Sequence, residues 1–421
     1  MDFFQIKNGE LHAEDVPLSR IAEEVGTPVY VYSRATFERH ARVFREALSG
    51  LERPPHIAFA VKSNPNLAVL SLLGREGYGA DVVSGGEMAR ALAAGMPAAD
   101  IVFSGVGKTQ RELADALDAG IGQFNIESGE EGRELAQIAA ERGVVAQCAL
   151  RVNPDVDAGT HDKISTGKAD NKFGVPIGHA PALFAELSAL PGLNMRGLAV
   201  HIGSQLSDLS PLQSAFGKLG DMMARLRGEG HEITNMDLGG GLGVPYRAGE
   251  VPPSPADYGA MVARVTKGWD VTLMFEPGRV IAGNAGVLLT RVIRVKRGLR
   301  HPFVIVDAAM NDLARPALYG AWHDFDAVKP TGERMMANIV GPICETGDTF
   351  ATDRETDALV SGDLAVFRTA GAYGATMASS YNSRGFVAEV MVDGSQFATV
   401  ADRIPPGDIA DAERVPDFLK R

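Results

Sequence analysis

Short apolar segments alternate with amphipathic stretches of helical length along the chain from about residue 57 to residue 283. Each short segment has the length of a strand and is bounded by turn residues. The strands predicted in this way are 57–62, 79–84, 101–104, 123–126, 146–152, 197–201, 235–238 and 271–275. Eight strand–helix units in succession predict a (β/α)8 barrel of the TIM type.

Helical periodicity fills the intervals between these strands. The clearest predicted helices are 86–94, 110–119, 130–142, 181–190 and 256–267. Three of them are followed by Gly95, Gly120 and Gly143, and glycine is the residue that helix C-termini prefer. The regular spacing therefore supports one continuous α/β domain.

The pattern changes after Gly283. Short β-branched runs separated by turn residues follow, at 287–295, 303–306, 339–344, 364–369 and 386–392. They predict an antiparallel β-barrel or sandwich domain. The strand-like segments 3–6 and 29–32 are expected to join it, because the barrel needs only its own eight units. The predicted domains are a barrel over 33–283 and a β domain made of 1–32 and 284–421.

Composition excludes several classes of function. The chain has 421 residues and a formal net charge of −12, which argues against nucleic acid as a partner. No apolar run approaches the ~20 residues that span a membrane, and the start shows no signal-peptide pattern. The two cysteines, Cys148 and Cys344, form no disulfide framework, so we expect a cytoplasmic protein. No metal-binding motif is evident.

Lys62 ends the first predicted strand, in the segment FAVKSNPN at 59–66. An amine placed in largely apolar surroundings loses its proton more readily, because burial disfavours the ammonium form. Such an amine can form a Schiff base with a carbonyl compound, pyridoxal phosphate (PLP) included. A lysine that extends from a strand end to solvent is the alternative, and the segment alone favours that alternative.

Further candidates follow the sixth, seventh and eighth strands, and in such barrels catalytic groups gather at these strand ends. His201 and Ser204 follow the sixth, a run of glycines at 239–241 follows the seventh, and Glu276 and Gly278 follow the eighth. Loops after the seventh and eighth strands of such barrels often hold a phosphate on backbone N–H groups. Glu276 could pair with Arg279 or with a pyridine nitrogen.

The β domain adds three candidate segments. Arg315 and Tyr319 lie four residues apart, Cys344 precedes Glu345, and Tyr373 lies in a turn. Arginine suits bidentate binding of a carboxylate. Taken singly, each segment is as compatible with a structural role as with a functional one.

Together these segments closely resemble one family, the diaminopimelate decarboxylases, which are PLP enzymes with an alanine-racemase-like barrel. The resemblance spans nearly the whole chain and rests on FAVKSNPN (59–66), HIGSQ (201–205), GGGLG (239–243), EPGR (276–279), RPALYGAWH (315–323), CETGD (344–348) and AYG (372–374). Residues 153–175, with THDKISTG and NKFG, match the family's long loop after the fifth strand. Thr346 stands where the family commonly has Ser.

The resemblance implies a role for each candidate. Lys62 would hold PLP as a Schiff base, His201 would stack on its ring and Glu276 would face the ring nitrogen. The cofactor-binding residues that it implies are Lys62, His201, Ser204, Gly240, Gly241, Glu276, Gly278, Arg279 and Tyr373. The substrate-binding residues that it implies are Arg279, Arg315, Tyr319, Glu345 and Tyr373.

The implied reaction is decarboxylation of meso-2,6-diaminopimelate to L-lysine, the last step of lysine biosynthesis. The implied catalytic residues are Lys62 and Cys344, and either could return a proton to the Cα atom. Cys344 would reach into the partner subunit's site, so a homodimer with active sites at the interface is expected. The loop 155–172 has a composition that suits a mobile lid.

Three alternatives use the same fold. A decarboxylase of ornithine, arginine or a polyamine precursor would not need Arg279, Arg315 and Glu345 together. An alanine racemase would need a catalytic tyrosine from the β domain instead. A non-catalytic PLP carrier or decoy would lack the second domain, Lys62 or Cys344.

Overall fold

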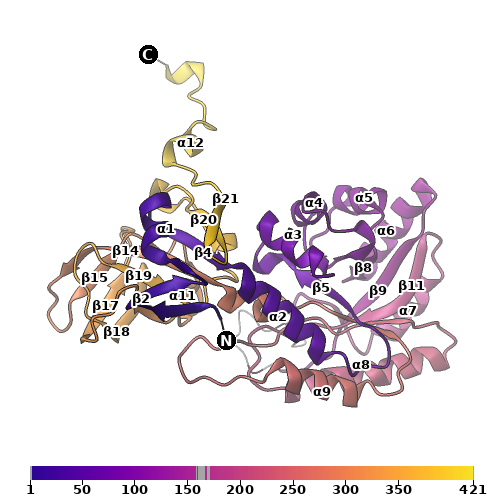
Figure 1. Cartoon of the computed structure of the whole chain (residues 1–421). Helices are drawn as coiled ribbons and strands as arrows, with labels where there is room; N and C mark the ends of the chain where they lie inside the picture. The colour runs from indigo at the N-terminus through magenta and orange to yellow at the C-terminus, as the bar shows by residue number, and fades with distance from the viewer. Residues whose placement is uncertain (1, 158, 160–165, 168–170, 421) are drawn as a thin grey trace. The chain divides into compact units, whose positions relative to one another are not determined.

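The computed structural model describes residues 2–157, 159, 166, 167 and 171–420 (Figure 1). The chain divides into two compact units. The barrel unit consists of residues 38–244 and 251–281, and the β unit consists of residues 1–37, 245–250 and 282–421. The short segment 245–250 therefore belongs to the β unit although barrel residues flank it, which the strand–helix alternation does not indicate.

The barrel unit contains a closed parallel sheet of eight strands, as the sequence predicts. The strands are β5 (His56–Ala60), β6 (Gly79–Val82), β7 (Ile101–Phe103), β8 (Gln123–Ile126), β9 (Ala146–Asn153), β11 (Leu193–Ala199), β12 (Asn235–Asp237) and β13 (Thr272–Phe275). Their order is β9-β11-β12-β13-β5-β6-β7-β8, and β8 pairs with β9 to close the ring. A two-residue strand, β10 (Val175–Pro176), pairs with β9 outside the ring.

Helices follow the barrel strands in the expected alternation. They are α3 (Leu67–Arg75), α4 (Gly85–Ala93), α5 (Gln110–Ala119), α6 (Gly129–Arg142), α7 (Ala180–Ser188), α8 (Ser210–Gly228) and α9 (Pro255–Val265). Their ends show why they form here. Thr109 caps α5 in a reciprocal capping box with Glu112, and Gly120 ends it in the left-handed conformation. Capping chemistry in the sequence thus defines α5 to the residue.

The β unit is built on a nine-stranded sheet with a separate three-stranded sheet. The strands are β1 (Phe4–Lys7), β2 (Glu10–Ala13), β3 (Val16–Pro17), β4 (Val29–Ser33), β14 (Gly286–Lys296), β15 (Phe303–Val306), β16 (Phe325–Ala327), β17 (Arg334–Val340), β18 (Thr349–Asp357), β19 (Leu364–Phe367), β20 (Ala388–Asp393) and β21 (Gln396–Ala401). The helices that accompany them are α1 (Leu18–Val25), α11 (Arg315–Tyr319) and α12 (Pro406–Ala410). Two helices cross the boundary between the units: α2 (Arg34–Ala47) begins in the β unit, and α10 (Arg279–Ala282) lies in the barrel unit except for its last residue.

Strand β4 confirms that the N-terminal residues join the β domain. It lies in the sheet between β14 and β20, and all five of its residues are buried. The sheet is mixed, however, and the expectation of a purely antiparallel domain is wrong for two pairs: β4 is parallel to β20, and β15 is parallel to β17. Runs of strand residues in a sequence do not encode the direction of pairing, which depends on connections distant in the chain.

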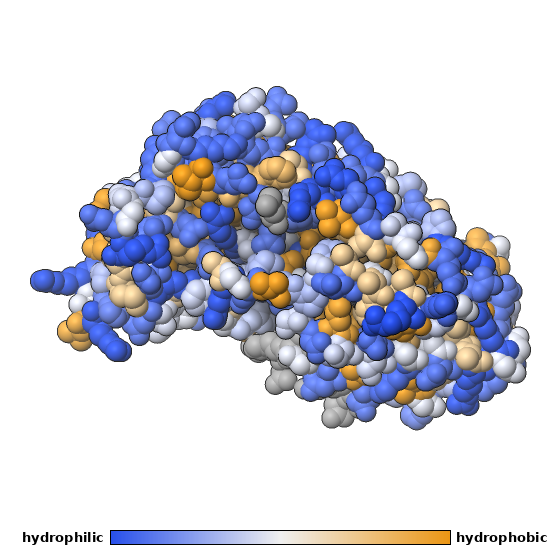
Figure 2. Space-filling view, turned by 60° about the horizontal axis from the view of Figure 1, so that its bottom comes forward, coloured by the Kyte–Doolittle hydropathy of each residue, from blue (hydrophilic) through white to orange (hydrophobic). Residues whose placement is uncertain are grey.

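The exterior is mainly hydrophilic on the face in Figure 2, with hydrophobic residues interspersed. Val251, Leu299 and Phe418 are among the exposed large hydrophobic residues. Scattered exposure of this kind is ordinary for a protein surface in water. Within the described parts of the chain, no helix has both the length and the apolar character needed to cross a membrane.

Candidate active site

Lys62 lies in a turn of 3₁₀ helix, Val61–Ser63, directly after β5. Its Nζ donates to Asp81 Oδ2 at 2.6 Å, and Asp81, on β6, has no exposed surface. The expectation of largely apolar surroundings for Lys62 is therefore wrong. The side chain is 34% exposed and ion-paired, which stabilises the ammonium form, so the ammonium must lose its proton, and with it the ion pair, before the amine can react.

A buried polar network surrounds Glu276, which follows β13. Ser104 Oγ donates to Glu276 Oε1 at 3.2 Å, and Asn125 Nδ2 donates to the same atom at 3.3 Å. Asn125 also donates to Asp237 Oδ2 at 2.9 Å. Glu276 and Asp237 are 7% and 1% exposed. The network thus joins strands β7, β8, β12 and β13 at one end of the barrel.

The carboxyl groups of this network resist ionisation. Burial raises the pKa of Glu276 well above its ordinary range, and the charges of Asp237 and Asp81 raise it further. Burial also raises the pKa of Asp237, which shares a hydrogen bond with Glu276. A buried group of carboxyls in this state favours a cationic ligand, because a positive charge relieves both the burial cost and the mutual repulsion.

His201 follows β11 and is fixed by the glycine run. The backbone N–H of Gly240 donates to His201 Nδ1 at 3.2 Å. Burial lowers the pKa of His201 well below its ordinary value, and the cations Arg151 and Lys62 lower it further. The ring is therefore neutral at neutral pH and carries its proton on Nε2.

The glycines after β12 and β13 are required by close backbone approach. A Cβ atom on Gly240 would lie 2.2 Å from the carbonyl oxygen of Glu276, and one on Gly241 would lie 2.5 Å from that of Gly203. Gly278 is less tight, since a Cβ atom there would lie 3.0 Å from the Ala60 Cβ and 3.1 Å from the Ser63 side chain. Neither the N–H of Gly241 nor that of Gly278 donates to another described residue, so both are available to a ligand.

Ser204 and Arg279 are brought together beside these glycines. Arg279 donates to Ser204 Oγ from Nη2 at 3.0 Å and from Nε at 3.3 Å, and Arg279 is only 6% exposed. A guanidinium and a hydroxyl at this position add cationic and polar donors to the glycine loops. Such a set can hold an anion.

These residues fit PLP. An amine beside a displaceable carboxylate can take an aldehyde, the carboxyl network can take a ring nitrogen, and the glycine N–H groups can take a phosphate. The Oδ1 atom of Asp81 is buried and has no hydrogen-bond partner among the described residues, as expected where a further polar group belongs. Among the described residues, no cluster of three or more His, Cys, Asp and Glu is arranged to hold a metal ion.

Arg315 and Tyr319 belong to the β unit, on α11. Arg315 is 6% exposed, and its Nη1 lies 3.0 Å from His323 Nε2. Its guanidinium also packs on the ring of Tyr246, 4.6 Å from the centroid. Two rings thus orient the predicted carboxylate-binding arginine.

Cys344 and Glu345 lie on the surface of the β unit. Both are exposed, and Glu345 Oε2 accepts a hydrogen bond of 2.7 Å from Tyr381. The backbone N–H of Cys344 donates to Asn382 Oδ1 at 3.0 Å. Tyr373, in the same unit, has a positive φ of 56°, a conformation that non-glycine residues rarely adopt. All three therefore lie in defined local structures.

Sequence reasoning did not find Asp81, Asp237, Asn125 or Ser104. Each is a polar residue at most 5% exposed, in or directly after a barrel strand. Asp81 is the one polar side chain of β6, and the strand before Ser104, β7, is wholly apolar and buried. A polar residue in a fully buried strand is the signal that could have found them, because burial of such a residue requires a partner. The predicted lid, 155–172, falls largely on residues outside the described part of the chain.

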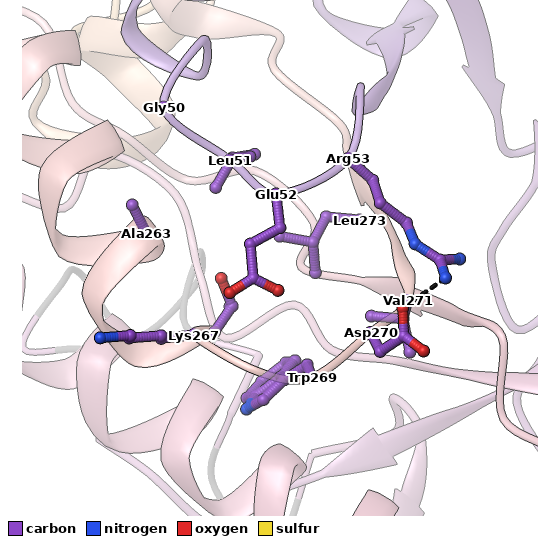
Figure 3. Close-up of a pocket in the computed structure, with 11 residues that line it drawn as sticks. Gly50, Leu51, Glu52, Arg53, Ala263, Lys267, Trp269, Asp270, Val271 and Leu273 are labelled. Carbon is purple, nitrogen blue, oxygen red and sulfur yellow. Dashed lines mark hydrogen bonds and ion pairs between the residues drawn. The ribbon is translucent and has the colours of Figure 1, made fainter.

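One pocket of the barrel unit lies away from all these residues (Figure 3). Its volume is about 220 Å³, and its lining comes from the loop 50–53 before β5 and from the end of α9 and the start of β13. Arg53 and Asp270 form an ion pair at its edge. The pocket therefore opens at the N-terminal ends of the strands, opposite to Lys62, where barrel residues usually serve stability.

Residues 34–283 match the model of the pyridoxal binding domain of pyridoxal-dependent decarboxylases. Among curated proteins, diaminopimelate decarboxylase of Zymomonas mobilis subsp. mobilis is 51% identical over 418 residues, 99% of each chain. The diaminopimelate decarboxylase of Pseudomonas aeruginosa is 53% identical over 405 residues, 96% of each chain.

Solved structures agree with these relatives. Diaminopimelate decarboxylase from M. jannaschii in complex with L-lysine has a TM-score of 0.96 and 35% identity, and the match covers 100% of this chain and 99% of that one. The Helicobacter pylori enzyme complexed with L-lysine has a TM-score of 0.90 and 37% identity, with coverage of 94% and 98%. A lysine/ornithine decarboxylase from Vibrio vulnificus, at 20% identity and a TM-score of 0.79, shares the fold.

Proposed function

The chain belongs to the diaminopimelate decarboxylase family of PLP-dependent enzymes, and from that premise we propose how its residues carry out the reaction. The reaction is removal of one carboxylate from meso-2,6-diaminopimelate as CO2, which gives L-lysine and completes lysine biosynthesis. The observation that carries this function is the position of Lys62 beside Asp81, at the barrel end where Glu276 and the glycine loops lie.

Lys62 would hold the cofactor through its amine, and it would be the group that the substrate amine replaces. Asp81 Oδ2, at 2.6 Å from Nζ, takes up the lysine ammonium whenever the lysine is released. Bound PLP supplies an electron sink for the electron pair that remains when CO2 leaves. The Lys62–Asp81 pair thus gives the released lysine a defined place and a charge partner.

Glu276 and His201 hold the ring. The Glu276 carboxyl, fixed by Ser104 and Asn125, is the group that would face the ring nitrogen and favour its protonated form. His201 is neutral, so it lies against the ring without adding a positive charge to it. Ser204, Gly240, Gly241, Gly278 and Tyr373 surround the phosphate in this proposal.

Substrate recognition falls to Arg279, Arg315, Tyr319 and Glu345. The arginines and Tyr319 bind the distal carboxylate, and Glu345 binds the distal amine. Cys344 acts in the partner subunit's site, so the active enzyme is a homodimer with shared sites. Cys344 and Lys62 are the two candidate acids that return a proton to Cα. Both cysteines are free thiols, in accord with a cytoplasmic enzyme.

The second candidate function is decarboxylation of ornithine, arginine or a polyamine precursor. These substrates lack the distal carboxylate, so they offer no group for the guanidinium that the proposal assigns to that carboxylate, Arg315. A site that hydrogen-bonds a substrate group rejects analogues that lack the group by a factor of about 10⁴–10⁵. The residue set therefore favours diaminopimelate.

The test is a panel of meso-diaminopimelate, ornithine, arginine and lysine, each assayed for CO2 release by the purified holoenzyme. We expect release from diaminopimelate and negligible release from the other three. Equal release from ornithine would overturn the substrate assignment in favour of the second candidate. A protein that binds PLP and releases no CO2 from any of the four would be a carrier instead.

A further inference from the structure

Asp237 ends β12 and precedes the glycine run, and none of the roles above uses it. It is 1% exposed, so each of its oxygens needs a partner inside the protein. Oδ1 accepts the backbone N–H of Gly239 at 2.9 Å, and Oδ2 accepts Asn125 Nδ2 at 2.9 Å. One carboxylate thus bonds to the glycine run with one oxygen and to the network around Glu276 with the other.

The Asn125 side of this link leads to Glu276. The Asn125 amide lies within hydrogen-bond distance of Asp237 Oδ2, Glu276 Oε1 at 3.3 Å and Ser104 Oγ at 3.1 Å. Its own oxygen is held by Gln123 Nε2 at 2.9 Å, which fixes the amide orientation. Asp237 therefore binds the same Asn125 amide nitrogen that donates to Glu276, and so helps to hold that nitrogen in place.

The Gly239 side of the link leads to the phosphate loop. Gly239 has φ of +64°, and the bond from its N–H fixes the first residue of the turn. The Gly239 carbonyl in turn accepts the backbone N–H of Glu276 at 2.8 Å. The next residue, Gly240, donates to His201, so the turn also sets the imidazole.

We propose that Asp237 is a positioning residue that couples the two ends of the cofactor site, holding Glu276 through Asn125 and the glycine run through Gly239. The inference rests on the proposed function, because it takes Glu276 as the partner of the ring nitrogen and the glycines as partners of the phosphate. Asp237 contacts neither the ring nor the substrate, and it acts through the residues that do.

The two links can be separated by substitution. Asp237→Ala removes both, whereas Asn125→Ala removes the part of the link to Glu276 that runs through Asn125 and leaves the direct hydrogen bond between Asp237 and Glu276 and the bond to Gly239. Asp237→Asn can keep one acceptor but must turn an NH2 group toward a donor, because Gly239 and Asn125 both donate. Met236→Ala, on the same strand and fully buried, is the matched control, since it destabilises β12 without breaking either link.

The experiment measures dissociation constants of PLP and of pyridoxal, which lacks the phosphate, by absorbance and fluorescence titration of each apoprotein. The ratio of the two constants reports the phosphate end alone. Loss of hydrogen bonds to a charged group predicts weakening of PLP binding by about tenfold to a hundredfold in Asp237→Ala. That variant should also lose part of the preference for PLP over pyridoxal.

Asn125→Ala should weaken both ligands by the same factor and leave the ratio as in the wild type. The inference would be overturned if Asp237→Ala kept the wild-type dissociation constants for PLP and pyridoxal and their wild-type ratio. It would also be overturned if Met236→Ala, at matched thermal stability, lost as much PLP affinity and as much preference for PLP as Asp237→Ala. Failure of the proposed function is distinguishable, because it would appear as absent CO2 release by the wild type while these cofactor titrations still report the coupling.

Discussion

The predicted site residues of the barrel unit and those of the β unit differ in burial and in the hydrogen bonds that fix them. In the barrel unit, Asp81, Asp237 and Glu276 are buried, and hydrogen bonds from neighbouring strands fix them. In the β unit, Cys344 and Glu345 are exposed, with local partners only. The buried residues of the barrel unit are thus held in fixed positions within one chain, whereas Cys344 and Glu345 lie at a surface.

This difference corresponds to the two tasks of the site. Cofactor chemistry needs fixed groups with shifted pKa values, and burial provides both. Substrate handling needs access for entry and release, which exposed residues provide. Each prediction below substitutes a residue of one unit and measures whether the effect fits this difference between buried and exposed residues.

The largest effect is expected at Lys62. Lys62→Ala removes the amine that holds the cofactor, so CO2 release should fall by a factor on the order of 10⁴ or more, together with the absorbance of lysine-bound cofactor. Lys62→Arg is the control for charge, and it should fail equally because a guanidinium does not deprotonate. A Lys62→Ala protein that keeps both signals would end the assignment.

Mixing two inactive variants tests whether Cys344 acts in the site of a second chain. Lys62→Ala and Cys344→Ala homodimers should each be inactive. Equal mixing with subunit exchange makes half of the dimers mixed, each with one intact site of two, so about a quarter of wild-type activity should return. Exchange is verified by mass tags. No recovery after verified exchange would show that Cys344 does not act across an interface.

Glu276→Gln tests the buried residues of the barrel unit. The variant keeps the shape and loses the charge, so turnover should fall by about 10²–10³-fold, with a much smaller change in KM. Ser104→Ala, which removes one neutral donor to Glu276, should cost about tenfold or less. Normal turnover with only a raised KM in Glu276→Gln would contradict the proposed role.

The β unit also contains a buried carboxyl whose ionised form is unfavourable, that of Asp312. Burial raises its pKa to about 6, so its contribution to stability is complete below the ordinary carboxyl range and is lost as pH rises through about 6. The asparagine of Asp312→Asn does not titrate. As pH rises through this range, the free energy of unfolding of the wild type should therefore fall relative to that of Asp312→Asn, by up to about 3 kcal/mol. Urea denaturation of both proteins across a pH series measures this, and a constant difference would refute it.

The smallest effect is expected at Arg315, which is buried although it belongs to the β unit. Arg315→Ala should lower kcat/KM for diaminopimelate by about tenfold to a hundredfold and leave PLP affinity unchanged. Arg315→Lys retains charge without the planar fork and should recover only part of the loss. Weakened PLP binding in Arg315→Ala would instead assign this residue to the cofactor.

The sequence predicted the barrel well because its information is local. Strand–helix alternation, capping residues such as Thr109 and glycine stops such as Gly120 are each readable within a few residues. The eight predicted strands correspond to the eight strands of the ring, with ends that shift by a few residues. Lys62 itself falls just beyond its strand, in the following turn.

The partners of the site residues were not predictable in the same way. Asp81 pairs with Lys62, and Asn125 joins Asp237 to Glu276, across separations of 19, 112 and 151 residues. No spacing in the sequence marks such pairs, since closure of the ring is what brings the strands together. The parallel pairing of β15 with β17, in the β unit, was missed because a strand pattern does not carry the direction of pairing.

The place of β4 in the sheet has a consequence for how the chain is made. Its neighbours are β14 and β20, and β20 leaves the ribosome only after the roughly 350 residues that separate it from β4 have been synthesised. At about 5–20 residues per second, β4 waits on the order of 20 to 70 s for its last partner, while the entire barrel emerges. Its five buried residues, Val29–Ser33, therefore stay without their final cover during translation, and the unpaired edge of this strand is open to non-native pairing until β20 arrives.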